Sequence, residues 1–178
     1  MQLVIGQKVS YPNQGVCLVE EFKIQTYGTR SISGYSLRVL NDNSTIFVPE
    51  ENANNVGIRP LISSAQCKKL IEKLSEDFEP VSGDWKTRSR EFTEKLRTGD
   101  VFQAAEVMKM LTFLSHEKKL SFREQTLLEK SKFLIVSEIS NTCGKSQAPA
   151  ECEIIGMVEA ACLKHIVTQP DLATTADH

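Results

Sequence analysis

The sequence predicts an α+β protein in which a small β-barrel or strongly bent sheet precedes a compact all-α domain of about five helices. Two observations predict this division. Residues 1–60 contain short segments of alternating polar and apolar side chains separated by turn residues, a pattern typical of strands. From residue 61 onward, nearly every segment repeats its apolar side chains at helical spacing. We therefore predict a β-rich domain over residues 1–60, a helical domain over residues 61–168 and a flexible tail over residues 169–178.

Turn residues divide the β-rich part into strands. Pro12-Asn13-Gln14-Gly15 and Asn41-Asp42-Asn43 are turn signals, and Gly28 and Gly34 are expected to bracket a loop or hairpin tip. Four or five short strands with tight turns are typical of a small barrel or bent sheet, whose edge a partner protein can use. The predicted strands cover residues 8–11, residues 16–20 with an extension over 22–27, residues 35–40, and residues 44–48 ended by Pro49.

Capping signals mark where the helices begin. Ser63 or Ser64 can cap the first helix. Ser121 and Glu124 have the spacing of a capping box, in which each side chain accepts a hydrogen bond from the other residue's backbone N–H. A break is predicted over residues 78–83, and Thr98-Gly99-Asp100 separates two further helices. The predicted helices cover about residues 63–76, 84–97, 101–118, 121–140 and 150–167.

Composition narrows the class of protein. The five cysteines are widely spaced, and their spacing includes no Cys-x-x-Cys pair, so neither a zinc site nor a redox motif is indicated and reduced thiols are expected. No apolar run approaches the roughly 18 residues of a membrane span, and the first residues do not resemble a signal peptide. We predict a cytoplasmic protein without a membrane segment.

The sequence contains no recognisable catalytic constellation. The three histidines do not stand at metal-ligand spacing, and no glycine-rich phosphate loop is present. Acidic pairs such as Glu20-Glu21 and Glu50-Glu51 fall at turns or strand ends, where solvation explains them. We therefore predict a protein that is not an enzyme and that binds neither a cofactor nor a metal.

Charge is distributed unevenly along the chain. The net charge is −2, yet residues 86–132 carry eleven basic and seven acidic side chains. This basic island is compatible with binding a polyanion. It is equally compatible with a solvated helical surface of mixed charge, and charge alone does not separate the two interpretations.

The single tryptophan, Trp85, lies at the predicted start of a basic helix. Lys86, Arg90, Thr93 and Arg97 share one face of that helix, and Arg88 flanks it. One interpretation makes Trp85 a packing residue, because it falls near Phe92 on the helical wheel. The other makes it an apolar wedge that stacks on DNA bases beside cations that hold phosphates. The residues alone leave both open.

Short motifs follow one another in a specific order over about residues 1–165. They are Gly6-Gln7-Lys8-Val9-Ser10-Tyr11-Pro12 with Gly15, Phe47-Val48-Pro49-Glu50-Glu51-Asn52-Ala53, Val56-Gly57-Ile58-Arg59, Trp85-Lys86-Thr87-Arg88-Ser89-Arg90, Glu94-Lys95-Leu96, Gly99-Asp100, Ala105-Glu106-Val107, Leu120-Ser121-Phe122-Arg123-Glu124 and Leu128-Glu129-Lys130. In this order they resemble the CarD/CdnL family of bacterial RNA polymerase-binding transcription regulators.

The resemblance implies a Tudor-like N-terminal domain that docks on the β subunit of RNA polymerase. It also implies a helical domain held near the upstream edge of the transcription bubble. There the family's tryptophan, which falls on Trp85, wedges into the minor groove and slows collapse of the open promoter complex. Binding to promoter DNA is then largely independent of sequence, and nothing demands more than a monomer.

Carried over residue by residue, the resemblance places polymerase contacts on Gln25, Thr26, Tyr27 and Phe47. Some family members have arginine where this chain has Gln25 and Phe47, so the predicted site is less charged here. The DNA contacts fall on the following residues: Trp85, Lys86, Arg88, Arg90, Arg97, Phe122 and Arg123.

Two further points stay open in the sequence. Gln125 stands where some members have a lysine, and Arg123 is the candidate to replace that phosphate contact. Phe122 matches an exposed aromatic residue of some members, but its place in a capping box also fits a packing residue. The alternative function is a CarD-type protein–protein adaptor that does not touch DNA, for which Trp85 is expected to be buried.

Overall fold

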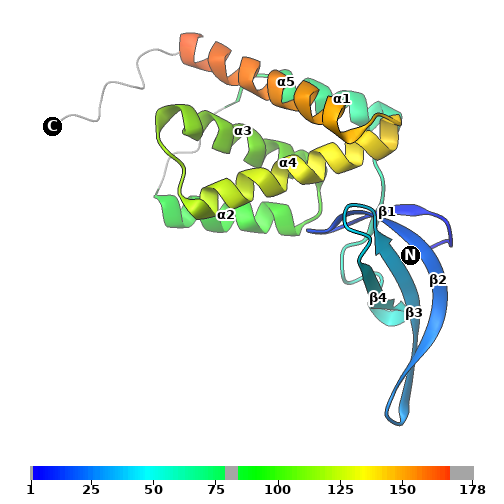
Figure 1. The fold of residues 1–178 in the computed structure, drawn as a ribbon. Helices are drawn as coiled ribbons and strands as arrows, with labels where there is room; N and C mark the ends of the chain where they lie inside the picture. Colours follow the sequence, from blue (N-terminus) through cyan, green and yellow to red (C-terminus); the bar gives the residue numbers. More distant parts are fainter. Residues whose placement is uncertain (1, 79–83, 169–178) are drawn as a thin grey trace.

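The computed structural model describes residues 2–78 and 84–168, and Figure 1 shows their arrangement. A bent antiparallel sheet lies at one end of the molecule and the helices form a bundle beside it. The α+β fold predicted from the sequence is therefore confirmed. The predicted tail, residues 169–178, and residues 79–83 of the predicted break lie outside the described residues.

Within the described residues, five strands form one sheet in the order β4-β3-β2-β1-β5. Neighbouring strands are antiparallel throughout. The strands are β1 (Lys8–Tyr11), β2 (Gly15–Tyr27), β3 (Arg30–Val39), β4 (Thr45–Pro49) and β5 (Arg59–Pro60).

The hairpin of β2 and β3 is longer than predicted. The two strands curve together and extend beyond the rest of the sheet (Figure 1). The register shifts between Val19 and Glu21, which marks a β-bulge, and a bulge bends and twists the strand that carries it. The segments predicted as 16–20 and 22–27 are therefore one continuous strand.

The predicted loop from Gly28 to Gly34 is wrong. Only Gly28 and Thr29 separate β2 from β3, and Gly34 lies inside β3, paired with Lys23. A Cβ on Gly34 would lie 2.8 Å from the Cζ atom of Phe47 and would also meet the backbone of β4. Gly34 is thus a glycine that close packing between strands requires. In the sequence alone it looks like a glycine of a turn.

The described part of the chain contains five α-helices, all close to the predicted positions. They are α1 (Ser64–Ser75), α2 (Trp85–Arg97), α3 (Val101–Glu117), α4 (Phe122–Cys143) and α5 (Gln147–Thr168). The last two are longer than predicted. Helix α4 continues to Gly144, whose left-handed conformation (φ 65°) ends it, and α5 tolerates Pro149 because that residue lies in its first turn.

Each part of the molecule has its own apolar core. The buried side chains of the sheet include Val9, Val19 and Leu37, and they form one cluster. A second cluster fills the helical bundle, with contributions from every helix, among them Leu70 and Leu111. The two clusters are separate, so polar and glycine contacts join the sheet to the helices.

One arginine joins the two parts. Arg59, on the last strand, donates from Nη1 and Nη2 to the two carboxylate oxygens of Glu138 on α4, at 2.5 and 2.8 Å. The same guanidinium donates to the carbonyl oxygen of Gly99, and Glu138 also accepts from the backbone N–H of Ile62 at 2.9 Å. Glu138 is 2% exposed, and a buried bidentate pair of this kind specifies one geometry.

Glycines permit the close packing of the two parts. Gly99 has φ +75°, and a Cβ there would lie 3.0 Å from Cγ of Pro12 on the β1–β2 turn. Gly15 has φ +80°, and a Cβ there would lie 3.0 Å from the ring of Phe133 on α4. The motif residues Pro12 and Gly15 of the sheet and the distant Gly99 of the helical part therefore build one interface.

Candidate nucleic-acid and protein interfaces

Trp85 is the first residue of α2 and its side chain is 56% exposed. Asp84 caps the helix: its carboxylate accepts from the backbone N–H of Thr87 at 2.9 Å, and this hydrogen bond lowers the pKa of Asp84. Phe92 and Leu96 are the apolar residues that α2 buries. The interpretation of Trp85 as a core residue is therefore wrong, because the helix packs through other side chains.

Three cations of α2 face solvent. Lys86, Arg90 and Arg97 are exposed, whereas Arg88 is half-buried. The Lys86 ammonium lies 5.9 Å from the centroid of the Trp85 ring, within the range of a weak cation–π contact. Arg97 pairs with Glu94 at 3.3 Å, so part of its charge is already balanced. Lys86 and Arg90 are thus the exposed cations of α2 that lie nearest to Trp85 along the helix.

Much of the basic island serves the fold. Lys95 pairs with Glu106 at 2.7 Å, and Lys132 pairs with Glu129 and Glu151. Lys109 is buried and donates to the carbonyl oxygens of residues at the end of α1, and burial lowers its pKa. These ammonium groups hold helices together, which leaves fewer cations for a polyanion than the sequence count suggests.

Phe122 is the first residue of α4 and is 86% exposed. The predicted capping box, whose residues Ser121 and Glu124 flank Phe122 in sequence, is present. The Glu124 amide donates to Ser121 Oγ, and Glu124 Oε2 accepts from the Ser121 amide at 2.8 Å. Arg123 is exposed beside it. Phe122 is therefore not a packing residue, because its ring is exposed. The capping box does not need the ring, since it acts through backbone and polar groups.

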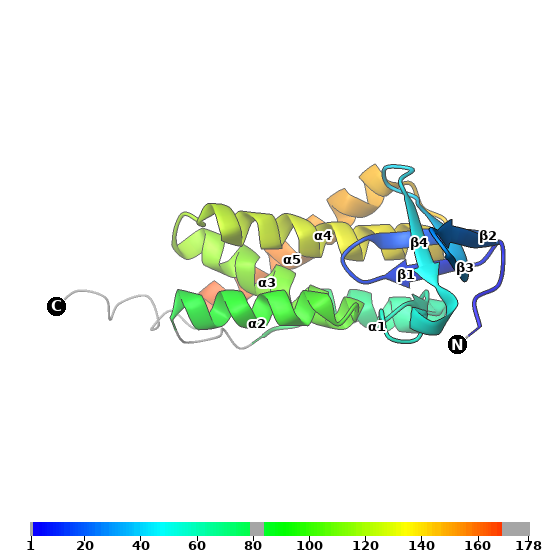
Figure 2. The same cartoon turned by 90° about the horizontal axis from the view of Figure 1, so that it is seen from below.

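The two exposed aromatic residues belong to the same end of the helical bundle. Helices α2 and α4 both begin at the end that lies farthest from the sheet (Figures 1 and 2). Both helix N-termini are already capped by carboxylates, Asp84 on α2 and Glu124 on α4, so the exposed side chains have to supply the positive charge for an anion. This distal end, defined by Trp85, Lys86, Arg90, Phe122 and Arg123, combines apolar rings with cations. That combination suits the bases and phosphates of a nucleic acid.

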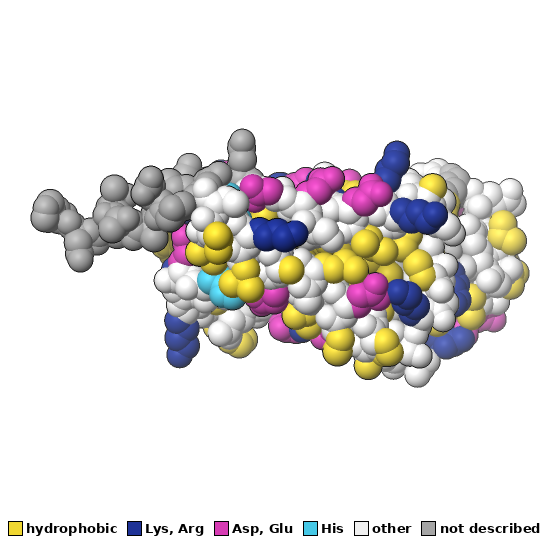
Figure 3. Space-filling view, turned by 90° about the horizontal axis from the view of Figure 1, so that it is seen from above, with side chains coloured by type: hydrophobic (Ala, Val, Ile, Leu, Met, Phe, Trp, Pro, Cys, Tyr) yellow, Lys and Arg dark blue, Asp and Glu magenta, His cyan; other side chains and the backbone are white. Residues whose placement is uncertain are grey.

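The face formed by α1 and α5 has a different character. Basic and acidic side chains are interspersed there with apolar ones, and the basic ones do not gather (Figure 3). Its ion pairs include Lys145 with Glu153. Because the positive charges are not concentrated there, a polyanion is expected to bind this face less strongly than the distal end.

The residues predicted to contact polymerase lie on the protruding hairpin and beside it. Gln25, Thr26 and Tyr27 end β2, and Tyr27 is 60% exposed and donates from its hydroxyl to the Gln25 side chain. By register, Gln25, Tyr27 and Phe47 share one face of the sheet, whereas Thr26 points to the other. Phe47 is half-buried and pairs with Ser36, nearer the base of the hairpin.

Sequence reasoning missed two apolar side chains on this hairpin. Ile24 is 68% exposed and Phe22 is 43% exposed, and Phe22 packs edge-on against Tyr35 with 5.0 Å between ring centroids. Both lie on the same face as Thr26. The alternation of Phe22, Ile24 and Thr26 was the available signal, since it continues the apolar face of β2 past the end of the core. Exposed apolar side chains on a protruding strand make this face of the hairpin a candidate protein-binding surface.

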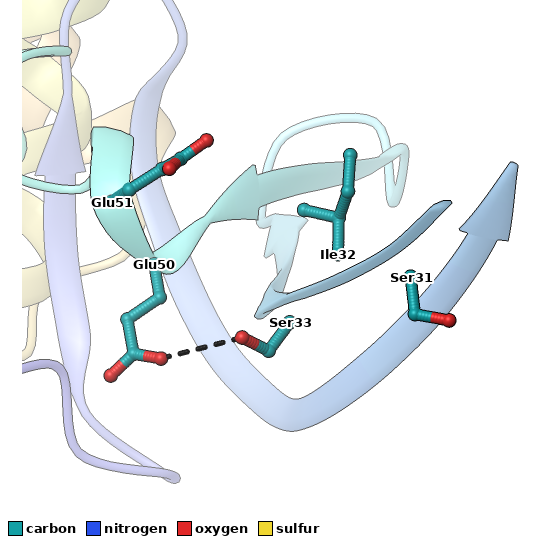
Figure 4. Close-up of a pocket in the computed structure, with 5 residues that line it drawn as sticks. All are labelled: Ser31, Ile32, Ser33, Glu50 and Glu51. Carbon is teal, nitrogen blue, oxygen red and sulfur yellow. Dashed lines mark hydrogen bonds between the residues drawn. The ribbon is translucent and has the colours of Figure 1, made fainter. Parts of the chain in front are cut away.

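A shallow hollow lies beside β3, with a cavity volume of about 400 Å³ (Figure 4). It is lined by Ser31, Ile32, Ser33, Glu50 and Glu51, and Glu50 turns toward the Ser33 hydroxyl, 3.5 Å away. The described residues contain no cluster of three or more potential metal ligands here or elsewhere. The hollow therefore adds an acidic rim to the hairpin surface.

Two family models match the chain and define its class. A model described as "CarD-like/TRCF RID domain" matches residues 3–62, and one described as "CarD, C-terminal domain" matches residues 69–155. An RID domain is an RNA polymerase-interacting domain, so the fold and the hairpin belong to a transcription regulator related to RNA polymerase interaction. The chain belongs to the CarD family.

One curated protein and one solved structure are similar to parts of this chain. A protein of Bacillus subtilis strain 168, YdeB, is named as a proposed transcription factor; it is 24% identical over 135 residues, which cover 76% of this chain and 88% of that protein. The solution structure of the N-terminal domain of Myxococcus xanthus CarD is 32% identical, covers 33% of this chain and 79% of that one, and gives a TM-score of 0.28. Among the described helices, none is long and apolar enough to cross a bilayer.

Proposed function

We propose that this protein docks on the β subunit of RNA polymerase through the β2–β3 hairpin and stabilises the open promoter complex with its distal end. In this proposal Trp85 wedges between bases at the upstream edge of the bubble, and Phe122 assists as a second apolar contact. Lys86, Arg90 and Arg123 hold phosphates without reading sequence. The protein acts by binding and not by catalysis.

One observation carries the proposal: the exposed indole of Trp85 stands at the start of a capped helix beside unburied cations. Base–aromatic stacking contributes roughly 1–3 kcal/mol, enough to slow bubble collapse by about 5- to 100-fold. The few cations available would bind DNA weakly by themselves. Tethering on polymerase raises their local concentration at the promoter and removes that difficulty.

The proposed polymerase surface combines Gln25, Tyr27 and Phe47 on one face of the hairpin with Thr26 and Ile24 on the other. Some relatives carry arginine at two of these positions, where this chain has the polar Gln25 and the apolar Phe47. We infer that contact with the β subunit depends more on apolar burial than on ion pairs, so polymerase binding should resist salt better than DNA binding does.

The test is the lifetime of open complexes on a weak promoter. Trp85→Ala should shorten it by roughly 5- to 100-fold, because the stacking contribution is lost, while affinity for polymerase stays as in the unaltered protein. Leu163→Ala serves as a matched control, since Leu163 is an exposed apolar residue on α5 and is not one of the residues that define the distal end. Equal lifetimes for Trp85→Ala and the control would contradict the wedge and favour an adaptor that does not touch DNA.

A further inference from the structure

Two cysteines distant in sequence lie side by side. Cys67, in the first turn of α1, and Cys143, the last residue of α4, have their Sγ atoms 3.0 Å apart. This separation is roughly 1 Å more than the S–S bond of about 2.05 Å. Gly144 follows Cys143 in a left-handed conformation, so the second cysteine stands at a helix end, where a small shift is easily accommodated.

We propose that Cys67 and Cys143 form a reversible disulfide, which makes this pair a modification site for low-molecular-weight disulfides such as oxidised glutathione. The proposal revises the expectation that all thiols stay reduced. It does not depend on the proposed function, because it concerns the bundle and not the distal end or the hairpin.

The two thiols differ in a way that suits sequential exchange. Cys143 is exposed and can meet a soluble disulfide, whereas Cys67 is 2% exposed and cannot. Burial raises the pKa of the Cys67 thiol to about 12, and its contact with Cys143 adds to this. Lys145, two residues beyond Cys143, places a positive charge close enough to oppose part of that rise. Cys143 is therefore the attacking thiol and Cys67 the resolving one.

The exchange balances in two steps. The Cys143 thiolate attacks one sulfur of oxidised glutathione, and the glutathione S–S bond breaks with release of one glutathione thiolate. Cys67 then loses its proton to solvent, and its sulfur attacks Cys143 Sγ in the mixed disulfide. The second glutathione leaves as a thiolate and is protonated. The protein loses two hydrogen atoms, and one glutathione disulfide is reduced to two thiols.

The other cysteines provide a contrast within the described residues. Cys17 and Cys162 are buried, and each thiol faces a backbone carbonyl oxygen, at 3.9 and 3.8 Å. Burial raises the pKa of Cys17 to about 11 and that of Cys162 to about 12. Cys152 is exposed on α5, where the structure places no second thiol beside it. Only Cys67 and Cys143 combine a reachable thiol with an adjacent partner.

The disulfide would close a ring at the junction of the two domains. Helix α1 begins directly after the segment that carries Arg59 and Ile62. The last turns of α4 hold that segment: Glu138 binds Arg59, and Thr142 Oγ1 donates to the Ile62 carbonyl oxygen at 3.4 Å. Oxidation would therefore link the start of α1 to the part of α4 on which the sheet rests.

The test uses the full chain in glutathione buffers of increasing oxidised fraction, followed by alkylation and peptide mapping. The unaltered protein should yield a Cys67–Cys143 peptide and a melting temperature raised by roughly 5–15 °C, because a disulfide across 76 residues of sequence constrains the unfolded chain. A thiol reductant should reverse both effects. Cys152→Ser is the matched control and should behave like the unaltered protein, whereas Cys143→Ser should show neither effect.

Two outcomes would overturn the proposal. One is a glutathione adduct on Cys143 that persists while Cys67 is still alkylated after unfolding. The other is a linked peptide that joins Cys143 to Cys152. Because Cys143 is exposed, its serine variant should keep its fold, and the unoxidised melting temperature of that variant checks this point directly.

Discussion

At the scale of single residues, backbone conformation decides where the two parts of the molecule touch. Gly15 and Gly99 both have positive φ, and each lies against a ring of the other part: Phe133 for Gly15 and Pro12 for Gly99. A side chain at either position would strain the backbone and push the domains apart. These glycines are therefore structural members of the interface.

Gly99→Ala should destabilise the protein by about 1–3 kcal/mol more than Gly144→Ala, measured by urea unfolding. The two glycines have similar φ values of 75° and 65°, but a Cβ on Gly144 meets nothing within 4 Å. The difference between the variants thus isolates the contact with Pro12. Equal losses of stability would mean that the interface tolerates the added methyl group.

Arg90→Ala and Arg123→Ala should each lower the salt dependence of promoter binding by polymerase with this protein, by about one unit of slope per cation. Arg97→Ala should change it less, because Glu94 already pairs with Arg97. The measurement is the binding constant of the complex across a range of salt concentrations. A larger effect for Arg97 than for Arg90 would place the phosphates on the other end of α2.

Exposure of individual side chains could be predicted only in part. The sequence placed Trp85 and Phe122 correctly at helix starts but left their burial open, because a helical wheel locates a face and not its neighbours. It also could not show which cations form ion pairs with Glu106 or donate to the carbonyl oxygens at the end of α1. Those pairings depend on contacts between helices, which local spacing does not encode.

At the scale of elements, caps explain why the helix starts were predictable. Ser63, Asp84, Asp100 and Ser121 each accept a backbone N–H within the first turn of the helix that follows. Such signals are local, so one sequence suffices to read them. Gly34 shows the opposite case, because the partner that requires a glycine there lies on another strand.

The capping box of α4 has a testable pH dependence. Burial raises the pKa of Glu124, but hydrogen bonds from Ser121 and the charge of Lys118 outweigh it, so the folded-state pKa is lowered. Glu124 thus contributes stability above its unfolded pKa of about 4.3, and this contribution is lost as the pH falls through the folded pKa.

Unfolding of the unaltered protein and of Glu124→Gln should therefore be compared between about pH 6 and about pH 3. The free energy of unfolding of the unaltered protein should fall faster, because only its Glu124 takes up a proton. Ser121→Ala should reduce this difference in slope, since it removes one of the hydrogen bonds that lower the pKa. Parallel slopes for all three proteins would contradict the assignment.

At the scale of the whole molecule, the contact between Arg59 and Glu138 is the main polar link between sheet and bundle. The Arg59 side chain is 28% exposed and that of Glu138 is 3% exposed, so loss of the guanidinium leaves a buried carboxylate without its charge partner. Nothing in the local sequence pairs these two residues, which stand 79 positions apart. The succession of strands and then helices could be predicted from periodicity, but the contacts that join the sheet to the bundle could not.

Arg59→Ala should cost about 2–4 kcal/mol in the free energy of unfolding, after allowance for the partial exposure of Arg59. Arg38→Ala provides a matched control, because Arg38 pairs with Glu20 at 2.5 Å on the sheet surface and should cost about 1 kcal/mol or less. Small-angle scattering would show whether the Arg59 variant also loses the single arrangement of its domains. Equal costs for the two arginines would mean that the buried pair adds nothing to docking.

The same link fixes the distance between the two ends of the molecule. The hairpin lies at one end and the starts of α2 and α4 at the other, and Arg59 and the glycine contacts set the span between them (Figure 1). Under the proposed function, this span determines how far upstream of the polymerase docking point the DNA is held. Arg59→Ala combined with residues inserted between Pro60 and Ser63 should release this link and then shift or broaden the protected region of the promoter, without loss of affinity for polymerase or for DNA alone.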